Sequence, residues 1–414
     1  MLVNGNHELP KGWKWVKLGE VCHTTSGGTP SRKETKYYNG NIPWVKSGEL
    51  DKGLITDTEE RITEEAIKNS SAKVFPKGTL LIALYGATIG KLAFLGVEAA
   101  TNQAICGIYQ NDIVASQFLY FYLLFKKPSL VDQGIGGAQP NISQTILKNL
   151  ELPLPSKEEQ QAIVSKIEEL FSELDKGIEN LRIAQRQLKT YRQAVLKWGF
   201  EGRLTNENVK EGVLPENWKN VVLGDVCHSV EYGSATKSKE RGKIPVLRMG
   251  NIQNGRFDWK DLVYTDDDEE IQKHLLKTND VLFNRTNSAE WVGKTAIFKG
   301  ERPAIFAGYL IRINRIERLI DANFLTYYLN SLKAKQYGNS VRSFGVNQSN
   351  INGTKLKSYP ISLPPINEQF RIVEEIESRI SIADKMEEGI AQNLERAEAL
   401  RQSILRKAFE GELV

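Results

Sequence analysis

Apolar residues recur at steps of three and four positions along two long stretches of the chain. The first set is Ile163, Ile167, Leu170, Leu174, Ile178, Leu181, Ala184, Leu188, Tyr191 and Val195. The second set repeats this spacing less regularly and is Ile372, Ile376, Ile380, Ala383, Met386, Ile390, Leu394, Ala397, Leu400 and Ile404. Such spacing is typical of a helix that packs along another helix. The pattern predicts two helices of about 40 residues, each roughly 60 Å long at about 1.5 Å per residue.

Both predicted helices begin after a proline-bearing segment and stop at a glycine. The segments are "LPLPSKEEQ" and "SLPPINEQF", in which Ser156 and Asn367 are the expected N-caps. Gly202 and Gly411 are expected to end the helices, because glycine readily adopts the left-handed conformation that follows a last turn.

The two helices are parts of a tandem duplication. "LGEVCH" at Leu18–His23 returns as "LGDVCH" at Leu223–His228. "RQAVLKWGFEGRL" from Arg192 returns as "RQSILRKAFEGEL" from Arg401, with seven identities in thirteen positions. The offset between matched residues varies from 202 to 206 through the first part of the repeat and then stays at 209. Each half is therefore predicted to be a globular domain with adjustable loops, followed by a helix of fixed length.

This organisation predicts a mixed α/β (α+β) fold with an internal pseudo-twofold duplication. The two globular domains are expected at residues 1–155 and 205–365, and the two helices at 156–204 and 366–414.

The charges on the two helices favour an antiparallel pair. Residues 157–179 hold three Lys against seven Asp or Glu, whereas 180–204 hold six Lys or Arg against one Glu. Residues 368–389 hold three basic against seven acidic residues, and 390–414 hold four of each. An antiparallel pair sets each acidic start beside a basic or neutral end. The connectivity agrees, because the second domain must begin where one helix ends and finish where the other starts. A coiled coil used for dimerisation is the alternative.

Composition limits the location and partners of the chain. The net charge is +4 with a pI near 8.7, and residues 205–365 carry 23 basic against 18 acidic groups. This mild surplus is compatible with nucleic acid. The N-terminal residues lack a signal-peptide pattern, and no apolar run is long enough for a membrane span. Three cysteines form no disulfide framework, so we expect a cytoplasmic protein.

The sequence offers no coherent catalytic or metal site. The Cys-His pairs at Cys22 and Cys227 lack further ligands, since Cys106 has no twin, and no metal is expected. "SAEWVGKT" ends like a phosphate-binding loop, but Ser288 stands where the first glycine belongs. Because Gly-Lys recurs in both halves, a structural turn explains it better. No motif for methylating a base is present.

Polar, basic and aromatic residues gather in loops at matched places in both halves. The loop pairs are "TTSGGTPSRKETKYYNGN" with "SVEYGSATKSKERGK", "LYGATIGK" with "LFNRTNSAEWVGK", and "GIGGAQPN" with "SFGVNQSN". Arg, Lys, Asn and Gln side chains contact phosphates and base edges in protein–DNA complexes. The candidate DNA-binding residues are Arg32, Lys33, Lys36, Tyr37, Lys46, Tyr85, Lys91, Gln139, Lys237, Lys239, Arg241, Arg248, Arg285, Asn287, Lys294, Arg342 and Gln348.

Several duplicated segments together resemble a known family. They are the domain openings "LPKGWKWVKLGEV" and "LPENWKNVVLGDV", the segment "NIPWVKSGEL" with its weaker twin "KIPVLRMGNI", "GATIGK", the helix starts "LPLPSKEEQQAIVSKIEEL" and "LPPINEQFRIVEEIE", and the twin "FEG" ends. In order and duplication, the whole chain resembles a specificity subunit of a type I restriction–modification system. Because "KIPVLRMGNI" is only loosely like its twin, the resemblance does not imply matching roles for Lys46 and Arg248.

The resemblance implies a non-catalytic subunit that recognises double-stranded DNA. Each globular domain would read one half of a split, asymmetric site, and the helices would set the unread spacer, with half-site centres ~34–36 Å apart. Two methyltransferase subunits would dock on the chain, and restriction subunits would join them. S-adenosylmethionine, ATP and Mg²⁺ would belong to those partners, so no cofactor is expected in this chain.

Two other classes of protein stay open at this point. A self-contained methylating or cutting enzyme would transfer methyl groups or cleave DNA without partners. A helical scaffold that recruits partners would bind DNA only through the salt-dependent electrostatic attraction that ignores sequence.

Overall fold

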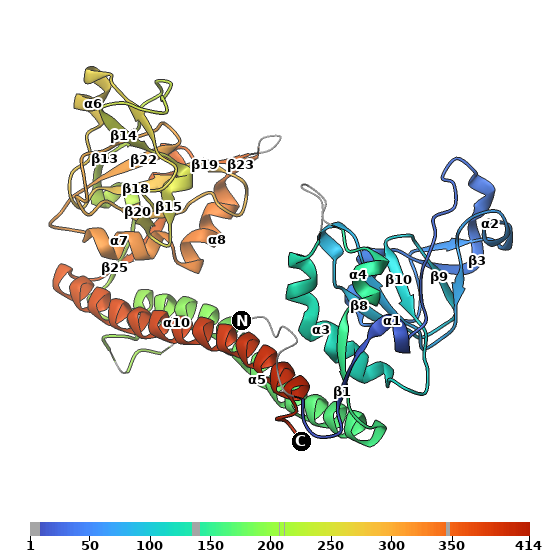
Figure 1. The fold of residues 1–414 in the computed structure, drawn as a ribbon. Coiled ribbons are helices and arrows are strands. Elements are labelled where there is room, and N and C mark those ends of the chain that lie inside the picture. The colour runs from blue at the N-terminus through green and yellow to red at the C-terminus, as the bar shows by residue number, and fades with distance from the viewer. Residues whose placement is uncertain (1–8, 135–140, 207, 211, 345–347) are drawn as a thin grey trace. The chain divides into compact units, whose positions relative to one another are not determined.

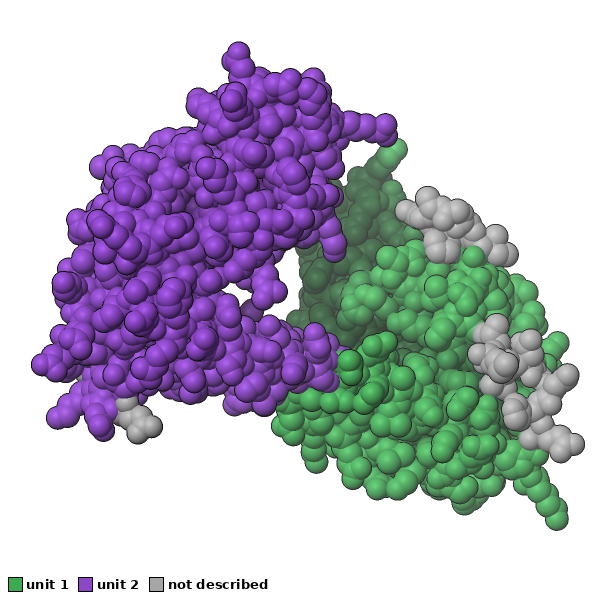
Figure 2. Space-filling view, turned by 90° about the vertical axis from the view of Figure 1, so that its left-hand side faces the viewer, with its two compact units in different colours: residues 1–181, 392–414 green, residues 182–391 purple. Residues whose placement is uncertain are grey.

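The fold is described from a computed structural model, which covers residues 9–134, 141–206, 208–210, 212–344 and 348–414. The chain divides into two compact units, which Figure 2 shows in different colours. Unit 1 consists of residues 1–181 and 392–414, and unit 2 consists of residues 182–391. Each unit contains a globular part and segments of two long helices, α5 (Lys157–Phe200) and α10 (Ile366–Glu410). The predicted mixed α/β fold with duplicated domains and two long helices is confirmed.

The globular part of unit 1 is built on a five-stranded and a four-stranded sheet. The five-stranded order is β2 (Thr24–Ser26), β10 (Ile105–Ile108), β7 (Leu80–Ala83), β8 (Leu92–Leu95) and β4 (Leu54–Ile55). The four-stranded order is β5 (Glu60–Ile62), β3 (Tyr38–Val45), β9 (Ala99–Thr101) and β6 (Val74–Phe75). A further antiparallel pair joins β1 (Lys14–Lys17) to β11 (Glu151–Leu154). The helices are α1 (Leu18–Val21), α2 (Glu64–Lys68), α3 (Ser116–Asp132) and α4 (Gln144–Lys148). Short 3-10 turns lie at η1 (Thr35–Tyr37), η2 (Ser47–Lys52) and η3 (Gly86–Thr88).

The globular part of unit 2 repeats this plan. A four-stranded sheet has the order β13 (Cys227–Tyr232), β22 (Leu310–Arg315), β18 (Val281–Asn284) and β20 (Thr295–Ile297). A three-stranded sheet has the order β17 (Val263–Thr265), β14 (Ile244–Leu247) and β21 (Ile305–Phe306). Smaller sheets contain β12 (Lys219–Val222) with β25 (Pro360–Leu363), β15 (Ile252–Gln253) with β16 (Arg256–Phe257), and β19 (Thr286–Asn287), β24 (Ser349–Asn350) and β23 (Ser343–Phe344). The helices and 3-10 turns are η4 (Leu223–Val226), η5 (Met249–Asn251), α6 (Asp268–His274), α7 (Ala322–Leu329), α8 (Leu332–Val341) and α9 (Gly353–Lys357).

The two units also share strand directions. In unit 1, β3 runs antiparallel to β5 and parallel to β9. In unit 2, β14 runs antiparallel to β17 and parallel to β21. A mixed sheet with one parallel pair in the same place is a specific arrangement. The likeness therefore extends to the topology of the globular parts.

The helix termini follow the sequence with one exception. Ser156 caps α5 as expected, since its hydroxyl accepts from the Glu159 N–H (3.2 Å) and its own N–H donates to the Glu159 carboxylate (3.0 Å). The prediction for Asn367 is wrong, because α10 begins at Ile366 and Asn367 lies inside it. The adjacent prolines fix the chain before the helix, and the Pro365 carbonyl accepts the first helical hydrogen bonds.

Glycines end both long helices in the same conformation. Gly202 has φ +77° and Gly411 has φ +76°, both in the left-handed region. In each case the next N–H donates to a carbonyl five residues earlier, from Arg203 to Trp198 and from Glu412 to Lys407. This bond pattern closes a helix at a glycine, as the sequence predicts.

Within each unit, the start of one long helix lies beside the end of the other (Figure 1). In unit 2, Arg192 of α5 pairs with Asp384 (2.5 Å) and Glu387 (2.8 Å) of α10. In unit 1, Arg401 of α10 pairs with Asp175 of α5. Both the arginines and the aspartates are 209 positions apart, so the repeat carries the same ion pair twice. The antiparallel pairing is confirmed.

Apolar residues of the long helices belong to the cores of the globular parts. In unit 1, Ile163 and Ile167 of α5 and Phe409 of α10 share a cluster with Phe118 and Tyr122 of α3. In unit 2, the matching cluster joins Val195, Phe200, Ile372 and Ile376 to Phe324 and Tyr328 of α7. Burying one such side chain stabilises a fold by about 1.5–3 kcal/mol. None of the helices in the described part of the chain has the length and apolar composition needed to cross a membrane.

Candidate nucleic-acid interface

The hairpins β7–β8 and β18–β20 carry one matched pair of candidate loops, and backbone hydrogen bonds define their register. The Leu84 N–H donates to the Ala104 carbonyl (2.8 Å), and the Arg285 N–H donates to the Tyr309 carbonyl (3.0 Å). The Leu84 carbonyl accepts from Ile142, and the Arg285 carbonyl accepts from Ile351. Arg285 therefore occupies the position of Leu84, a fully buried residue. One backbone site presents an apolar side chain in unit 1 and a guanidinium in unit 2.

Arg285 is held against an aromatic ring. Its guanidinium carbon lies 4.8 Å from the centroid of the Tyr232 ring, and its Nη1 donates to the Gly308 carbonyl (3.2 Å). The Tyr232 hydroxyl accepts from the Gly353 N–H (2.8 Å), which fixes the ring. The buried Nε of Arg285 has no hydrogen-bond partner among the described residues. Stacking sets the position of the guanidinium, and its Nη2 donates to none of the described residues.

The Gly-Lys pairs are matched structural turns. The Lys91 carbonyl accepts from Ala83 (2.9 Å), and the Lys294 carbonyl accepts from Asn284 (2.8 Å). The preceding glycines, Gly90 and Gly293, have φ of +73° and +91°. The interpretation of these motifs as turns is confirmed.

The turn of unit 2 is two residues longer, since residues 286–293 replace residues 85–90. The longer loop carries Trp291, whose side chain is 45% exposed. The Lys294 ammonium lies 3.9 Å from the centroid of that ring, and burial lowers the pKa of Lys294. Lys294 also approaches the Gln253 side chain (3.3 Å).

Other candidates of unit 2 surround the same loop. Asn287 lies in β19 opposite Ser349 of β24, and exposed Gln348 directly precedes β24. Arg342 donates to the Ala289 carbonyl of the loop (2.9 Å) and to the Asn339 side chain (2.7 Å). The structure thus brings five candidates together around residues 285–294: Arg285, Asn287, Lys294, Arg342 and Gln348.

The candidates between β13 and β14 lie on a neighbouring loop. Near the start of this loop, the Ser234 carbonyl accepts from the N–H of Gly308, and the Gly308 carbonyl in turn accepts from Arg285. Lys239 pairs with Asp266 (3.0 Å). Lys237 and Arg241 are exposed, and neither has an ion-pair partner among the residues that the structure describes.

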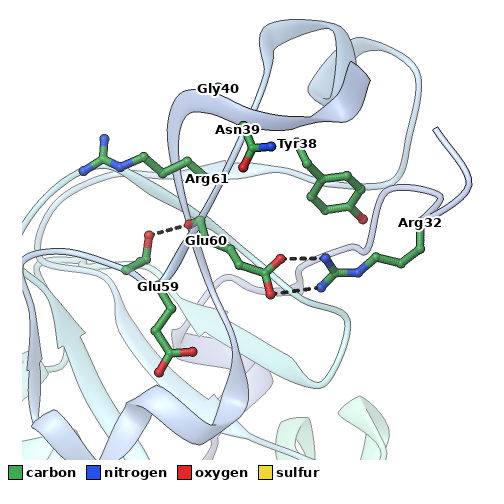
Figure 3. Close-up of a pocket in the computed structure, with 8 residues that line it drawn as sticks. Arg32, Tyr38, Asn39, Gly40, Glu59, Glu60 and Arg61 are labelled. Carbon is green, nitrogen blue, oxygen red and sulfur yellow. Dashed lines mark hydrogen bonds and ion pairs between the residues drawn. The ribbon is translucent and has the colours of Figure 1, made fainter. Parts of the chain in front are cut away.

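In unit 1, Arg32 and Lys46 converge on the Glu60 carboxylate, and Figure 3 shows the two bonds from Arg32. Arg32 binds Glu60 through two hydrogen bonds (2.6 and 3.3 Å), and its guanidinium carbon lies 4.5 Å from the Tyr38 ring centroid. Lys46 reaches Glu60 (3.2 Å) and Glu59 (2.7 Å). The hydrogen bond from Arg32 is the main cause that lowers the pKa of Glu60. An open cavity of about 500 Å³ is lined by Arg32, Tyr38, Glu59 and Glu60 together with Asn39, Gly40, Thr58 and Arg61.

The remaining candidates of unit 1 are dispersed. Lys36 of η1 pairs with Glu65 (2.5 Å) and lies 5.6 Å from the centroid of the half-buried Tyr37 ring. Lys91 pairs with Asp51 (2.5 Å). Lys33 and Tyr85 are exposed. Gln139 lies outside the described residues.

Lys46 and Arg248 have the same backbone role, although the sequence does not imply matching DNA contacts for them. Lys46 precedes η2 and its N–H donates to the Glu49 carboxylate (2.9 Å). Arg248 precedes η5 and its N–H donates to the Asn251 side chain (2.9 Å). The side chains differ, since Arg248 donates to the Asp261 carbonyl (2.9 Å) instead of pairing with a carboxylate.

A family model described as type I restriction modification DNA specificity domain matches residues 10–181 and 215–396. The chain belongs to this family. It is 26% identical over 422 residues to the specificity subunit of the type I restriction enzyme EcoKI of Escherichia coli (strain K12), covering 98% of this chain and 90% of that protein.

Solved structures share the fold of the family. A chain from a study of complex assembly and conformational transition in a type I restriction–modification system matches with a TM-score of 0.78 and 22% identity, over 98% of this chain and 100% of that one. The HsdS subunit from Thermoanaerobacter tengcongensis matches with a TM-score of 0.61 and 21% identity, over the whole of both chains.

Ion pairs hold most basic candidates of unit 1, and in unit 2 they hold Lys239 but not Arg285 or Lys294 among the described residues. Four in unit 1 are paired with carboxylates: Arg32, Lys36, Lys46 and Lys91. In unit 2, Arg285 and Lys294 lie over aromatic rings and donate to uncharged oxygens. A cation over a ring keeps its full charge for a phosphate or a base, whereas an ion-paired cation must first lose its partner.

Sequence reasoning missed two exposed aromatic residues beside the unit 2 candidates, Trp291 and Tyr309. Tyr309 follows Gly308 and is 49% exposed. The only sequence signal was an aromatic residue next to a glycine or a charged residue, which is too common to single out a site.

Proposed function

We propose that the chain is the non-catalytic, sequence-reading subunit of a type I restriction–modification complex, in which each globular part binds one half of a bipartite, asymmetric DNA site. One observation carries this proposal. The two domains share a topology, yet matched backbone positions present different side chains, as at Leu84 and Arg285. Equal scaffolds with unequal loops are suited to two different half-sites.

The long helices would set the distance between the half-sites. Their matched ion pairs lie 209 residues apart in the sequence, which is the constant offset of the helical segments. The globular loops, by contrast, differ in length between the two halves. We propose that the helices also dock two methyltransferase subunits, and that restriction subunits complete the complex. S-adenosylmethionine, ATP and Mg²⁺ would be bound by those partners in the cytoplasm. The candidate DNA-binding residues remain proposals, with the cluster around 285–294 as the best-assembled set.

The test is to co-express the chain with the methyltransferase subunit of its system and to map methylated bases across a genome. We expect a split, asymmetric motif with a fixed unread gap. Methylation without such a motif would contradict the proposal and favour a scaffold that binds DNA without reading sequence. Methyl transfer by the purified chain alone would contradict its non-catalytic role.

A further inference from the structure

A buried glutamine joins the globular part of unit 1 to its long helix. Gln160 lies in the first turn of α5 and is 1% exposed. Its side-chain oxygen accepts from the Ala115 N–H (2.8 Å), and its side-chain nitrogen donates to the carbonyls of Ile113 (3.1 Å) and Pro155 (3.2 Å). Ala115 directly precedes α3, so the contact lies where the globular part meets α5.

Gln369 makes the same three contacts in unit 2. It is fully buried in the first turn of α10, accepts from the Asp321 N–H (2.8 Å), and donates to the carbonyls of Leu319 and Pro364 (both 2.9 Å). Asp321 directly precedes α7. Each glutamine therefore accepts from the N–H of the residue directly before a domain helix. It donates to the carbonyl two residues before that residue, and to the carbonyl five residues before itself.

The chemistry of the contact requires glutamine. Both amide hydrogens are donated and the oxygen accepts, so each side chain is fully satisfied while buried. Glutamate could not donate to the two carbonyls, and asparagine is one methylene too short to span the same gap. The two glutamines are 209 positions apart, whereas Ala115 and Asp321 are 206 apart. The contact thus joins the helical segment, whose length is the same in both halves, to the globular segment, whose length differs between the halves.

Aromatic packing holds the same junctions but is less directional. The Phe409 ring centroid lies 5.3 Å from Phe118 and 5.0 Å from Tyr122, and Phe200 contacts Phe324 and Tyr328 in the same way. Apolar contact is non-directional, whereas a hydrogen bond is lost when its geometry changes by a fraction of its length. One base-pair step is ~3.4 Å along DNA. A domain displaced by that distance would break the two hydrogen bonds that its glutamine makes to the segment before the domain helix.

We propose that Gln160 and Gln369 are positioning residues that hold each reading domain at one place on its helix and so enforce a single spacer length in the DNA site. The inference rests on the proposed function and deepens it. It assigns a part of sequence specificity to side chains that are buried away from DNA.

The test compares spacer lengths rather than activity alone. Gln160→Met keeps the length of the side chain but removes its donors and acceptor, and Gln369→Met does so in unit 2. Each variant is co-expressed with the methyltransferase subunit, and methylation is mapped at sites whose spacer is the wild-type length or one base pair shorter or longer. We expect unchanged half-sites and an increase on the order of tenfold in methylation at the altered spacers, relative to wild type.

Tyr122→Phe is the matched control in unit 1. It removes the buried hydrogen bond from the Tyr122 hydroxyl to the Glu151 carbonyl, and leaves Gln160 in place. We expect some loss of stability and an unchanged spacer. Relaxed spacing in this control would overturn the proposal, because general loosening would then explain the effect.

The remaining outcomes are also decisive. Strict spacing in both methionine variants, with methylation of the normal site retained, would overturn the positioning role. A wild-type chain that yields no bipartite motif would overturn the proposed function instead. If neither methionine variant assembles, Gln160→Asn, which keeps the amide but shortens it, provides the same comparison.

Discussion

Arg285 stacks its guanidinium on the ring of Tyr232, 4.8 Å from the ring centroid, at a backbone position that holds the buried Leu84 in the other unit. Stacking removes much of the conformational freedom of a long side chain before DNA arrives. A preorganised guanidinium loses less entropy when it forms two hydrogen bonds to a guanine edge. We therefore regard Arg285 as the strongest candidate for base reading in unit 2.

Replacing Arg285 by Ala should relax specificity at one position of one half-site. A good bidentate contact with a base is worth about 1–3 kcal/mol of discrimination. The change is measured as methylation of single-base variants of the motif by the assembled complex. A uniform loss across all sequences would instead identify Arg285 as a phosphate contact.

Arg302→Ala is the control for this prediction. Arg302 is exposed and lies 4.5 Å from the Trp259 ring centroid, so it repeats the arginine–aromatic contact in unit 2 outside the candidate loops. We expect its replacement to leave the motif unchanged. Equal relaxation by both variants would contradict the assignment of base reading to Arg285 and its loop.

Lys294 and Lys91 should contribute unequally to the salt dependence of DNA binding. Lys294 lies over Trp291, whereas Lys91 pairs with Asp51. Each phosphate contact lowers the slope of log K against log salt by about 0.9. Lys294→Met is expected to reduce the magnitude of the slope by about one, and Lys91→Met by clearly less. The slopes are measured by titrating the assembled complex with its site at several salt concentrations, and equal changes would contradict the prediction.

Low pH should destabilise unit 2 through His274. The imidazole is buried, and burial lowers its pKa although Glu231 (3.6 Å) and Glu270 (3.7 Å) oppose that shift. In the unfolded chain, histidine takes up a proton near pH 6.5. The unfolded state therefore binds more protons than the folded state as the pH falls below about 6.5, and the free energy of unfolding decreases in that window.

Urea unfolding at about pH 5.5 and 7.5 tests this effect. His274→Asn should reduce the difference between the two pH values, because the titrating group is gone. His228→Asn, at an exposed histidine of the same unit, is the control and should leave the difference unchanged. A difference that persists in His274→Asn would place the pH sensitivity in other groups.

The sequence predicted the helices and their pairing because both depend on local information. Apolar spacing is a property of neighbouring positions, and the change from an acidic start to a basic or neutral end along each helix leads directly to pairs such as Arg192 with Asp384. Asn367 failed as a cap because two prolines in a row start the helix two residues earlier than a cap at Asn367 would.

The interaction partners of the candidate side chains could not be predicted from the sequence in the same way. Arg32 meets Glu60 across 28 positions, and Lys91 meets Asp51 across 40, so no local pattern reports these partners. Aligning the repeats by sequence also placed Arg285 without revealing that its structural counterpart is Leu84. That match depends on hydrogen bonds between strands, which only the folded chain displays.

Lengthening both long helices should lengthen the DNA spacer. The ion-paired residues define where to insert, because Asp175 and Arg192 in α5 are as far apart as Asp384 and Arg401 in α10. Seven residues are added between Asp175 and Arg192 in α5, and seven between Asp384 and Arg401 in α10. These insertions preserve both ion pairs between the helices and keep the helical face nearly constant. At about 1.5 Å per residue the insertion adds roughly 10 Å, close to three base-pair steps. We expect both half-sites to be unchanged and the unread gap to be longer by about three base pairs, as measured by methylation mapping.

Seven residues inserted in the connector between α5 and β12 are the control and should leave the gap unaltered. An unchanged gap in the helix variant, with methylation retained, would mean that the helices do not set the spacing.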